Sequence, residues 1–443
     1  MTEPAPTGPV LAEPAPTGPA PTEPAPGPGP AEDRAFSAPH HRGRLRANWL
    51  GSQSSTPQYT VSPRSTAEVL EAVRYAVRRR MPVRPAGAGY SWSALAVTGG
   101  MLVETGELVG MGEVDPATAR VWVRAGTTVR DLGDLLWTAG YSLTQQGFFD
   151  RQTIVGALTT GTHGSGAELG NLASFVRGVR VIDGRGRLVE ITEDDPAELR
   201  AARLSLGMLG VIVEVLLQVE PRYHLTRQIS FPTWDEALGT LEVDLAAHRH
   251  YSTMWSPADD SLQKCYQIQS PPGVAMSDRN LTFVFDKTDA RHGEPSHHVL
   301  SARDGESPSP FHELEYAVPI ERAAEAMTSA RRLLRERHPE REHPLFFRFA
   351  AADDAYLSPF CGRDSITVSA GAWPDSGEDA FFDAVHHLLL ADFDARPHWG
   401  KLFRHERADV RRLFPELPRF AAVRSEFDPH DLFLNDALRT LFA

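Results

Sequence analysis

The sequence predicts an α+β protein built from two domains. With 443 residues, the chain is too long for one ordinary hydrophobic core. Up to Pro221, short strand-like and helix-like patterns are joined by glycine-rich turns. Beyond Pro221 the glycine turns become fewer and the amphipathic stretches longer, which places a domain boundary near this residue.

The composition is that of a globular protein, with 41% hydrophobic and 23% charged residues. A formal net charge of −13 argues against nucleic-acid binding, because that function needs a basic face. The only cysteines, Cys265 and Cys361, are too few for a disulfide framework or a thiolate metal site. No apolar run approaches the roughly 20 residues that cross a bilayer, and the N-terminus lacks a signal-peptide layout. We therefore expect a cytoplasmic protein with no membrane or nucleic-acid partner.

Residues 1–33 repeat a Pro-rich unit. The run EPAPTGP begins at Glu3 and again at Glu13, and EPAPGPGP begins at Glu23. Pro and Gly at this density cannot bury apolar surface, so we expect a disordered, polyproline-II-like tail. We interpret it as a dispensable extension rather than a docking motif.

The first folded domain is expected over residues 45–221. A helix should begin after Ser65, which precedes Glu68 by the spacing of a capping box. The run MPVRPAG then reads as a short strand, and ARVWVRAG alternates as a strand does. VRDLGDLLWTAG has apolar residues at helical spacing and ends at Gly140. A further helix should begin at Pro196, and the strand VIVEVLLQVEP stops at its proline.

The second domain is expected over residues 222–395, and a C-terminal segment over 396–443 should return to the first domain. PIERAAEAMTSARRLL and SGEDAFFDAVHHLLLADF carry apolar residues on one helical face, so both should be helices packed on a sheet. FFRFA reads as an apolar strand that contains Arg348. A buried Arg348 would need an anionic partner, whereas an edge-strand arginine that reaches solvent is the commoner case.

Two glycine-rich segments of the first domain could cradle phosphate oxygens. They are the turn RPAGAGYSW (84–92) and the run QTIVGALTTGTHGSG (152–166), which combine free backbone N–H groups with short hydroxyls. Neither is a P-loop, because no Gly-Lys-Ser/Thr follows. The turn also lacks the third glycine of the G-x-G-x-x-G dinucleotide fingerprint. Each segment alone is weak evidence for a cofactor.

A rare lysine stands in the run RPHWGK near the C-terminus. Lys264, Lys287 and Lys401 are the only lysines among 45 basic residues. Lys401, beside His398, could stabilise an oxyanion or an anionic reduced cofactor ring, or it could be an ordinary surface residue. We expect no metal site, because the histidine pairs are adjacent in sequence and no H-E-x-x-H or C-x-x-C motif occurs.

Together these segments resemble the vanillyl-alcohol-oxidase superfamily of FAD-binding proteins. The two glycine segments and SLGMLGVIVEV resemble its FAD-binding domain, and HELEYAVP, DDAYLSP, ARPHWGK and FDPHDLFLNDALRTLF resemble its aldonolactone and alditol oxidase branch. The resemblance covers nearly everything except the N-terminal tail. It implies a vanillyl-alcohol-oxidase-type fold, in which an α+β FAD domain is joined to a substrate domain with an antiparallel sheet and flanking helices.

The resemblance also implies roles for individual residues. The expected FAD contacts are Pro85, Ala86, Gly87, Ala88, Gly89, Tyr90, Ser91, Gly156, Thr159, Gly161, Thr162, His163, Gly164, Ser165, Val211, Ile212 and Lys401. The expected substrate contacts are Phe346, Arg348, Ser369 and Lys401. In such enzymes an alcohol C–H gives a hydride to flavin N5, and the electrons pass to O₂ or another acceptor.

The sequence departs from the family at three of these positions. Tyr90 replaces the histidine that often anchors the flavin covalently, so we expect non-covalent FAD, with an aryl-ether link as the alternative. Phe346 replaces the glutamate of a Glu-x-Arg pair, and Ser369 replaces a histidine. On this interpretation Arg348 and Lys401 are left with no matched carboxylate.

Three hypotheses about function follow. The first is a FAD-dependent oxidoreductase acting on a specialised metabolite with an alcohol or amine, because Phe346 should disfavour a naked sugar alcohol. Its catalytic residues would be Lys401, Arg348, His398 and Tyr90, and the base would be Tyr90, His398 or a solvent-derived group. The second is ordinary aldonolactone or alditol oxidation, with Glu315 or Asp353 as the replacement carboxylate. The third is a flavin-binding protein without turnover.

Overall fold

Residues 36–301 and 310–443 are described in a computed structural model, and the tail predicted for residues 1–33 lies outside them. The N-terminal part of this chain contains a four-stranded sheet in the order β1-β4-β6-β5. The strands β4, β6 and β5 run parallel, and β1 pairs antiparallel with β4. Their bounds are β1 His40–His41, β4 Tyr59–Val61, β5 Val83–Ala86 and β6 Met101–Glu104.

A second, antiparallel sheet follows, in the order β10-β9-β11-β7. The strands predicted from alternation, β7 and β11, are neighbours in it. The bounds are β7 Arg120–Arg124, β9 Val176–Ile182, β10 Leu188–Thr192 and β11 Val211–Gln218. Alternating burial along β7 matches the alternation of its sequence, because one face packs on the core and the other does not.

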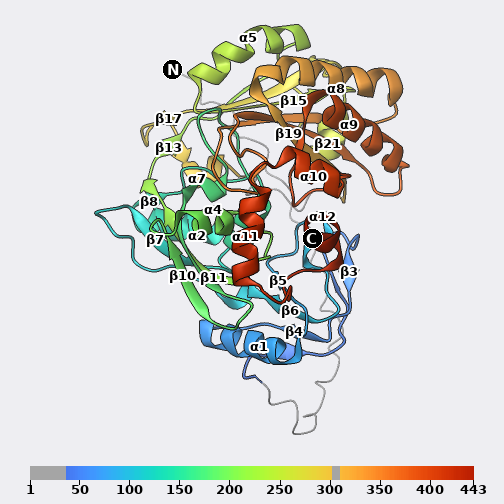
Figure 1. The fold of residues 1–443 in the computed structure, drawn as a ribbon. Helices are drawn as coiled ribbons and strands as arrows, with labels where there is room; N and C mark the ends of the chain where they lie inside the picture. The colour runs from blue at the N-terminus through green and yellow to red at the C-terminus, as the bar shows by residue number, and fades with distance from the viewer. Residues whose placement is uncertain (1–35, 302–309) are drawn as a thin grey trace, which may run out of the picture. The chain divides into compact units, whose positions relative to one another are not determined.

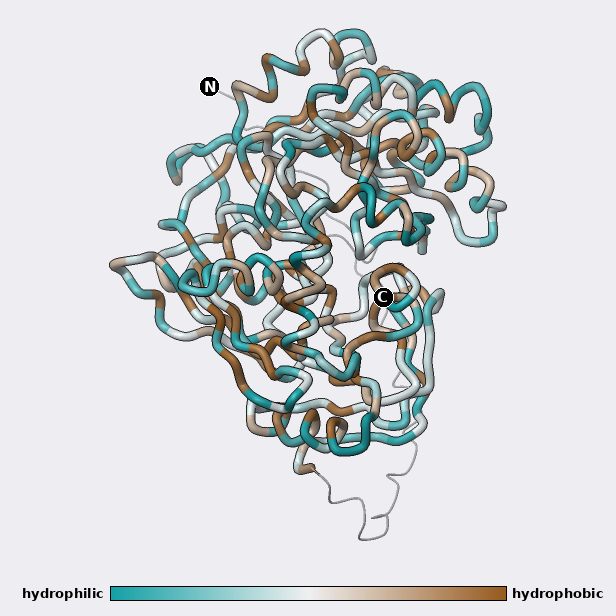
Figure 2. The backbone as a smooth tube through the Cα atoms, viewed as in Figure 1, coloured by the Kyte–Doolittle hydropathy of each residue, from teal (hydrophilic) through white to brown (hydrophobic). Residues whose placement is uncertain are grey.

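Four helices accompany these two sheets. They are α1 Thr66–Arg79, α2 Val129–Thr138, α3 Ile154–Thr160 and α4 Pro196–Arg203. The Ser65 hydroxyl accepts from the Glu68 N–H as predicted, but the Glu68 carboxylate accepts from the N–H of Arg64 rather than that of Ser65. The capping box is therefore only half formed. Polar and apolar residues alternate along α1, and its apolar face is buried (Figure 2).

The C-terminal half contains a seven-stranded sheet in the order β14-β16-β15-β20-β21-β19-β22. Its bounds are β14 Gln228–Ser230, β15 His250–Ser256, β16 Arg279–Phe285, β19 His312–Pro319, β20 Leu345–Ala350, β21 Ser365–Ala372 and β22 Arg396–Pro397. The helices α5 Trp234–Ala247, α8 Ala323–Arg337 and α9 Glu378–Phe393 pack on this sheet (Figure 1). Strand β20 lies in the centre of the sheet. Arg348 is therefore not a solvent-facing residue of an edge strand, although we considered that arrangement the commoner one.

Three C-terminal helices complete the chain: α10 Arg407–Leu413, α11 Leu417–Phe427 and α12 Asp436–Phe442. Helix α11 contacts α4, and its Phe420 shares a hydrophobic cluster with Val181 of β9. The Val83 N–H of β5 donates to the Leu432 carbonyl at 2.7 Å, and the Gly184 N–H donates to the Phe427 carbonyl at 2.8 Å. These contacts support the predicted return of residues 396–443 to the first domain, although the exact domain limits stay a prediction.

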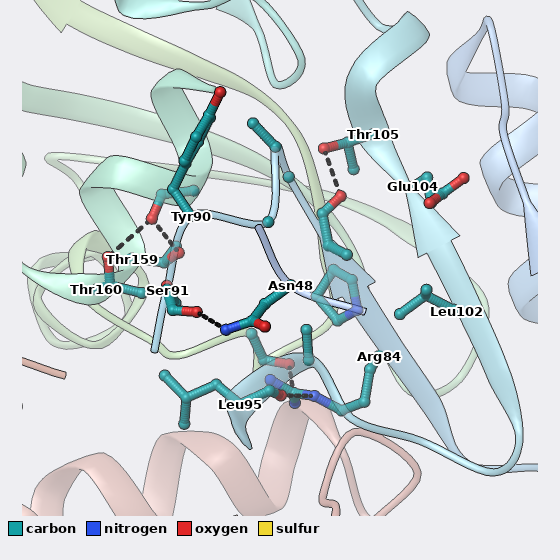
Figure 3. Close-up of a pocket in the computed structure, with 18 of the residues that line it drawn as sticks. Asn48, Arg84, Tyr90, Ser91, Leu95, Leu102, Glu104, Thr105, Thr159 and Thr160 are labelled. Carbon is teal, nitrogen blue, oxygen red and sulfur yellow. Dashed lines mark hydrogen bonds between the residues drawn. The ribbon is translucent and has the colours of Figure 1, made fainter. Parts of the chain in front are cut away.

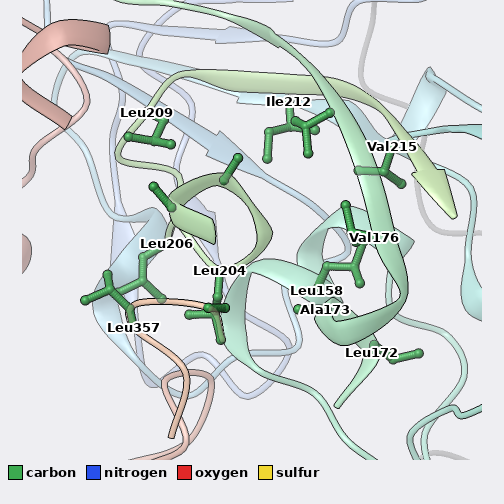
Figure 4. Close-up of a cluster of buried hydrophobic side chains, with 14 of the residues drawn as sticks. Leu158, Leu172, Ala173, Val176, Leu204, Leu206, Leu209, Ile212, Val215 and Leu357 are labelled. Carbon is green, nitrogen blue, oxygen red and sulfur yellow. The ribbon is translucent and has the colours of Figure 1, made fainter. Parts of the chain in front are cut away.

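The core of the first half lies between the antiparallel sheet and the helices that cover it. Figure 4 shows part of it, where Leu158 of α3, Val176 of β9 and Ile212 of β11 converge with Leu206 and Leu357. The short remaining elements are β2 Arg46–Ala47, β3 Ser54–Ser55, β8 Tyr141–Ser142, β12 Glu220–Pro221, β13 His224–Leu225, β17 Lys287–Thr288, β18 Glu294–Pro295, α6 Ser261–Tyr266 and α7 Ser296–Val299.

Candidate active site

A cavity lies where the first glycine-rich turn meets α3 (Figure 3). The predicted cofactor contacts that line it are Pro85, Ala86, Gly87, Ala88, Gly89, Tyr90, Ser91, Gly156, Thr159 and Ile212. The cavity is also lined by Asn48, Arg84 and Thr160, which the sequence analysis did not select. Strand β5 positions the turn, because its parallel pairing with β6 ends at Ala86, immediately before the first glycine.

The turn is built to bring bare backbone close to a ligand. A Cβ on Gly87 would lie 2.1 Å from Thr153 Oγ1, so no larger residue fits there without a shift, and Gly89 has a φ of +77°. The N–H groups of residues 87–91 donate to no other group among the described residues. Free N–H groups in a glycine turn suit the oxygens of a pyrophosphate, so the residues present fit FAD.

The RPHWGK run packs directly onto this turn. The Trp92 N–H donates to the Gly400 carbonyl at 2.8 Å, and the Ser93 hydroxyl donates to the Trp399 carbonyl at 2.6 Å. The Lys401 ammonium lies 4.4 Å from the centre of the Trp92 ring, a cation–π distance. Two motifs more than 300 residues apart in sequence thus pack against each other, and Lys401 lies at the edge of their contact.

A buried ionic network lies beside this junction. Arg348 Nη2 is 2.5 Å from Glu315 Oε1, and His163 Nε2 is 2.8 Å from the same oxygen. Lys401 pairs with Glu313 and lies 4.0 Å from Glu315 Oε2. The expectation that Arg348 and Lys401 lack matched carboxylates is therefore wrong. Both carboxylates come from β19, and the sequence of β20 alone could not show that β19 lies close to it in the sheet.

Strand register explains how these side chains meet. Glu315 of β19 pairs with Ser369 of β21, and Ser369 pairs with Phe346 of β20. Residues directly opposite in antiparallel strands project to the same face. Glu313 also shares that face, because it stands two residues before Glu315. The alternation in HELEY could have indicated that Glu313 lies on the same face as Glu315, but we did not select Glu313. We considered Glu315 only as one of two possible replacement carboxylates.

The protonation states of this network follow from its burial and charges. Burial opposes ionisation of Glu315, but Arg348 and His163 outweigh it and hold the pKa of this carboxyl well below 4.5. Burial, and then the charge of Arg348, lowers the pKa of His163. Burial lowers the pKa of His398 to about 3. At neutral pH the network is an ionised carboxylate beside neutral imidazoles.

Several polar atoms of this region have no hydrogen-bond partner among the described residues. They are Glu315 Oε2, Ser369 Oγ, Thr367 Oγ1 and Arg348 Nε. Unsatisfied buried polar atoms are costly, and in a native protein they mark a bound molecule or a functional group. An ionised carboxylate only accepts hydrogen bonds, so Glu315 Oε2 suits a ligand hydroxyl.

The remaining predicted residues lie in other places. The predicted FAD contacts that do not line the cavity at the turn are Gly161, Thr162, His163, Gly164, Ser165, Val211 and Lys401. His163 belongs to the ionic network, and Gly164 and Ser165 line a second, smaller cavity beside Arg348. Their contacts with FAD stay a prediction.

Asp353, the other replacement carboxylate considered, accepts hydrogen bonds from the Ser358 hydroxyl and the Ala355 N–H. No ion pair joins it to Arg348 or Lys401 within residues 36–301 and 310–443. Burial raises the pKa of Asp353 to about 7.

His163, Glu315 and His398 bring three possible metal-ligand atoms within 4.8 Å of one another. The Glu315 oxygen nearest His163 already accepts a hydrogen bond from the Arg348 guanidinium. A permanent positive charge at that oxygen disfavours a second cation there. We therefore interpret the cluster as a hydrogen-bonded ionic network.

Comparison with known proteins supplies the family. Residues 57–192 match the FAD binding domain family, and residues 277–441 match the D-arabinono-1,4-lactone oxidase family. An L-gulono-1,4-lactone dehydrogenase of Mycobacterium tuberculosis is 31% identical over 421 residues, which cover 89% of this chain and 98% of that protein. The chain belongs to the aldonolactone and alditol oxidase branch of the vanillyl-alcohol-oxidase flavoproteins. It is an FAD-dependent oxidoreductase that acts on CH–OH groups.

Other members of this flavoprotein branch align over similar lengths. The L-gulonolactone oxidase of Mus musculus is 27% identical, over 91% of this chain and 99% of that protein. The alditol oxidase of a Streptomyces species is 28% identical, over 89% and 98% respectively. A crystal structure of cholesterol oxidase from B. sterolicum shares the fold, with a TM-score of 0.78 at 14% identity over 94% of this chain and all of that one. Among the helices described, none has the length and apolar character that crossing a membrane requires.

Proposed function

We propose that this flavoprotein oxidises the carbinol carbon of a substrate less polar than a sugar, with Glu315 as the group that takes the hydroxyl proton. The observation that carries the proposal is the buried Glu315 carboxylate: one oxygen is held by Arg348, and the other lies 4.0 Å from Lys401 and has no hydrogen-bond partner among the described residues. Phe346, opposite Ser369 on the same sheet face, supports a less polar substrate. A specialised metabolite fits this pattern better than a simple polyol.

Each residue of the network has a definable task. When bound, FAD would supply the redox chemistry, as an acceptor for a hydride from the alcohol C–H and a donor of the two electrons to O₂ or another acceptor. Glu315 Oε2 accepts the hydroxyl proton as the C–O bond becomes a carbonyl. Although Glu315 is a weak base, the hydroxyl becomes far more acidic as the hydride leaves, so a carboxylate is strong enough. Arg348 keeps Glu315 ionised and oriented.

Lys401 contributes positive charge at the edge of the site. Its ammonium is held by Glu313 and the Trp92 ring, both of which fix its position. A fixed cation favours negative charge developing on a neighbouring cofactor ring or substrate oxygen. His398 is a poorer candidate for the base, because its Nδ1 accepts from the Gly400 N–H and its pKa of about 3 makes it a weak proton acceptor.

Oxidation of an aldonolactone or an alditol is the second candidate. Glu315 supports it, because this residue supplies at the sheet face the carboxylate that Phe346 lacks. The names of the relatives, gulonolactone oxidase and alditol oxidase, point the same way. The electron acceptor and a cytoplasmic location stay predictions under either candidate.

Anaerobic reduction of the flavin separates the two candidates. The holoenzyme is mixed without O₂ with L-gulono-1,4-lactone, xylitol and a set of aryl and alicyclic alcohols, and the loss of the yellow flavin absorbance is followed. We expect the apolar alcohols to bleach the flavin faster than xylitol or the lactone. Faster bleaching by the lactone or xylitol would favour the second candidate, and no bleaching by any member of the panel would contradict both.

A further inference from the structure

Carbonyl groups of the glycine turn are held by donors from two segments outside the turn, and the first of these donors is Thr105. Thr105 directly follows β6, just as Gly87 directly follows β5, at the point where the parallel pairing of these strands ends. The Thr105 hydroxyl donates to the Ala86 carbonyl at 3.2 Å (Figure 3). Thr105 is buried and also lines the cavity at the turn, so its hydroxyl fixes the peptide unit that enters the turn.

The second segment is the hairpin formed by β2 and β3, which pair antiparallel. The Asn48 side-chain amide donates to the Ser91 carbonyl at 2.9 Å (Figure 3). The Trp49 N–H donates to the Gly89 carbonyl at 3.0 Å. The carboxamide oxygen of Asn48 accepts from the Gln53 N–H at 3.1 Å, so the side chain is oriented within the hairpin. Asn48 therefore joins the hairpin to the turn.

A trans peptide unit that is held at its carbonyl has a fixed N–H direction. The unit is planar, and its C=O and N–H point to opposite sides. No peptide bond among the described residues is cis. The unit between Ser91 and Trp92 shows the arrangement in full, because its carbonyl accepts from Asn48 and its N–H donates to the Gly400 carbonyl at 2.8 Å. Both ends of this peptide unit thus have partners in the protein.

Two other peptide units of the turn show only the carbonyl half of this arrangement. Their carbonyls, those of Ala86 and Gly89, are held as described above. Their N–H groups, those of Gly87 and Tyr90, donate to no acceptor among the described residues. Neither Gly87 nor Tyr90 is buried, and both line the cavity, whose volume of about 220 Å³ far exceeds that of one water molecule. Fixed N–H groups with no partner suit the oxygens of an anion.

We propose that Thr105 and Asn48 are positioning residues for the pyrophosphate of FAD. By holding carbonyls of the turn, they direct the N–H groups of Gly87 and Tyr90 toward the pyrophosphate oxygens. Asn48 acts through the hairpin, which brings the Trp49 N–H to the turn. Donors that are oriented in advance bind a charged group more strongly, because they need no reorganisation when it arrives. This role does not depend on the substrate or on the proton acceptor proposed above.

The phosphorus NMR signals of bound FAD test the role of Thr105. Their chemical shifts respond to hydrogen bonds at the pyrophosphate, whether or not the flavin ring is bonded to the protein. Spectra of the holoenzyme are compared with those of Thr105→Val, which removes the hydroxyl but keeps the shape of the side chain. We expect at least one pyrophosphate signal to move by more than its linewidth, and Thr105→Ser, which keeps the hydroxyl, to restore the wild-type spectrum. An unchanged spectrum in Thr105→Val would overturn the role of Thr105.

Asn48→Asp tests the hairpin separately. Its carboxylate can still accept from the Gln53 N–H but cannot donate to the Ser91 carbonyl, so we expect the pyrophosphate signals to move here too. Gln53→Glu controls for the added charge, because it places a carboxylate in the same hairpin and leaves the bond to Ser91 intact. A shift in Asn48→Asp no larger than that in Gln53→Glu would overturn the role of Asn48.

Thr226 provides the matched control for the loss of a hydroxyl. Its hydroxyl donates to the Asp286 carbonyl at 3.4 Å, and it does not line the cavity at the turn. Thr226→Val should leave the pyrophosphate signals in place, and a shift there equal to that in Thr105→Val would overturn the assignment. A Thr105→Val protein that folds, as judged by circular dichroism, but loses the FAD that Thr226→Val retains would also support it. If Thr105→Val does not fold, the hairpin variants decide the outcome.

Discussion

Phe346 and Glu315 lie on the same sheet face, and only Glu315 carries a carboxylate. By resemblance to the family, an acidic residue is expected at Phe346, two residues before Arg348. In this chain the carboxylate that reaches Arg348 comes from β19, two strands away, across Ser369. An aromatic ring therefore stands where the resemblance implies a polar group, and this is the physical basis for our proposal of a less polar substrate.

Tyr90 is the residue on which the mode of flavin attachment depends. It lines the cavity at the glycine turn (Figure 3). Its ring packs against that of Phe149, with 4.5 Å between ring centres. A tyrosine cannot form the histidyl bond that many relatives use. We therefore expect acid precipitation of the protein to release the flavin into the supernatant. A yellow pellet that turns colourless in Tyr90→Phe would show instead that the phenol is bonded to the flavin.

Individual residues also mark what the sequence could and could not predict. The glycine turn lines a cavity, and Gly87 and Gly89 are required there by a close approach and a positive φ, while its contact with FAD stays a prediction. The partner of Arg348 could not be selected, because an alternating strand reveals its two faces but not its neighbours. Pairing between β19, β21 and β20 is a tertiary fact, and it decides that Glu315 rather than Asp353 reaches the arginine.

At the scale of elements, Arg84 links the glycine turn by hydrogen bonds to the loop before β11 and to the C-terminal segment. This buried side chain of β5 donates to the carbonyls of Leu95, Leu206, Gly207 and Phe433. Burial lowers the pKa of Arg84 to about 9, so it stays charged at neutral pH. Arg84 thereby holds together the turn, the loop before β11 and the C-terminal segment, and among the described residues no carboxylate pairs with it.

Replacement of Arg84 should therefore loosen the whole junction. Arg84→Met keeps much of the side-chain length but leaves these carbonyls without a donor, so we expect a loss of about 3 kcal/mol or more in the free energy of unfolding. Urea titration followed by circular dichroism measures it. The matched control, Arg78→Met at an exposed position of α1, should change stability by less than about 0.5 kcal/mol. A loss below about 1 kcal/mol in Arg84→Met would contradict this role.

The elements themselves were largely readable from sequence. Alternation predicted β7 and β11, and helical spacing predicted α1, α2, α8 and α9. The centre of the seven-stranded sheet was not readable, because FFRFA is equally consistent with an edge strand until β15 and β21 are known to flank β20. The tail predicted at residues 1–33 lies outside the described residues.

The whole molecule should lose stability on mild acidification. Burial lowers the pKa of His250 and His405 to about 4 and that of His398 to about 3, below the ordinary 6.5. Between pH 6.5 and 4 the unfolded chain binds protons that the folded protein excludes, so each of these histidines reduces stability by about 1.4 kcal/mol per pH unit. Burial raises the pKa of Asp353 and Asp428, which therefore act in the opposite direction, but these are two groups against the six histidines whose pKa burial lowers.

Urea unfolding at pH 7.5, 6 and 5 tests this expectation. Stability should fall steadily below pH 6.5, and His405→Gln should show a shallower decline, because it removes one of the histidines that titrate only on unfolding. Equal stability of the wild-type protein at pH 7.5 and pH 5 would show that these histidines are not held neutral in the folded state.

The rate of anaerobic flavin reduction in two carboxamide variants tests the central claim most directly. The holoenzyme, Glu315→Gln and Asp353→Asn are each loaded with FAD, checked for equal flavin content and mixed with the alcohol that reduces the wild type fastest. We predict that Glu315→Gln slows reduction by about 100-fold or more, the usual contribution of a proton acceptor, while Asp353→Asn stays within about threefold of the wild type. The assignment of Glu315 would be contradicted if Glu315→Gln reduced its flavin at the wild-type rate, or if Asp353→Asn alone slowed flavin reduction.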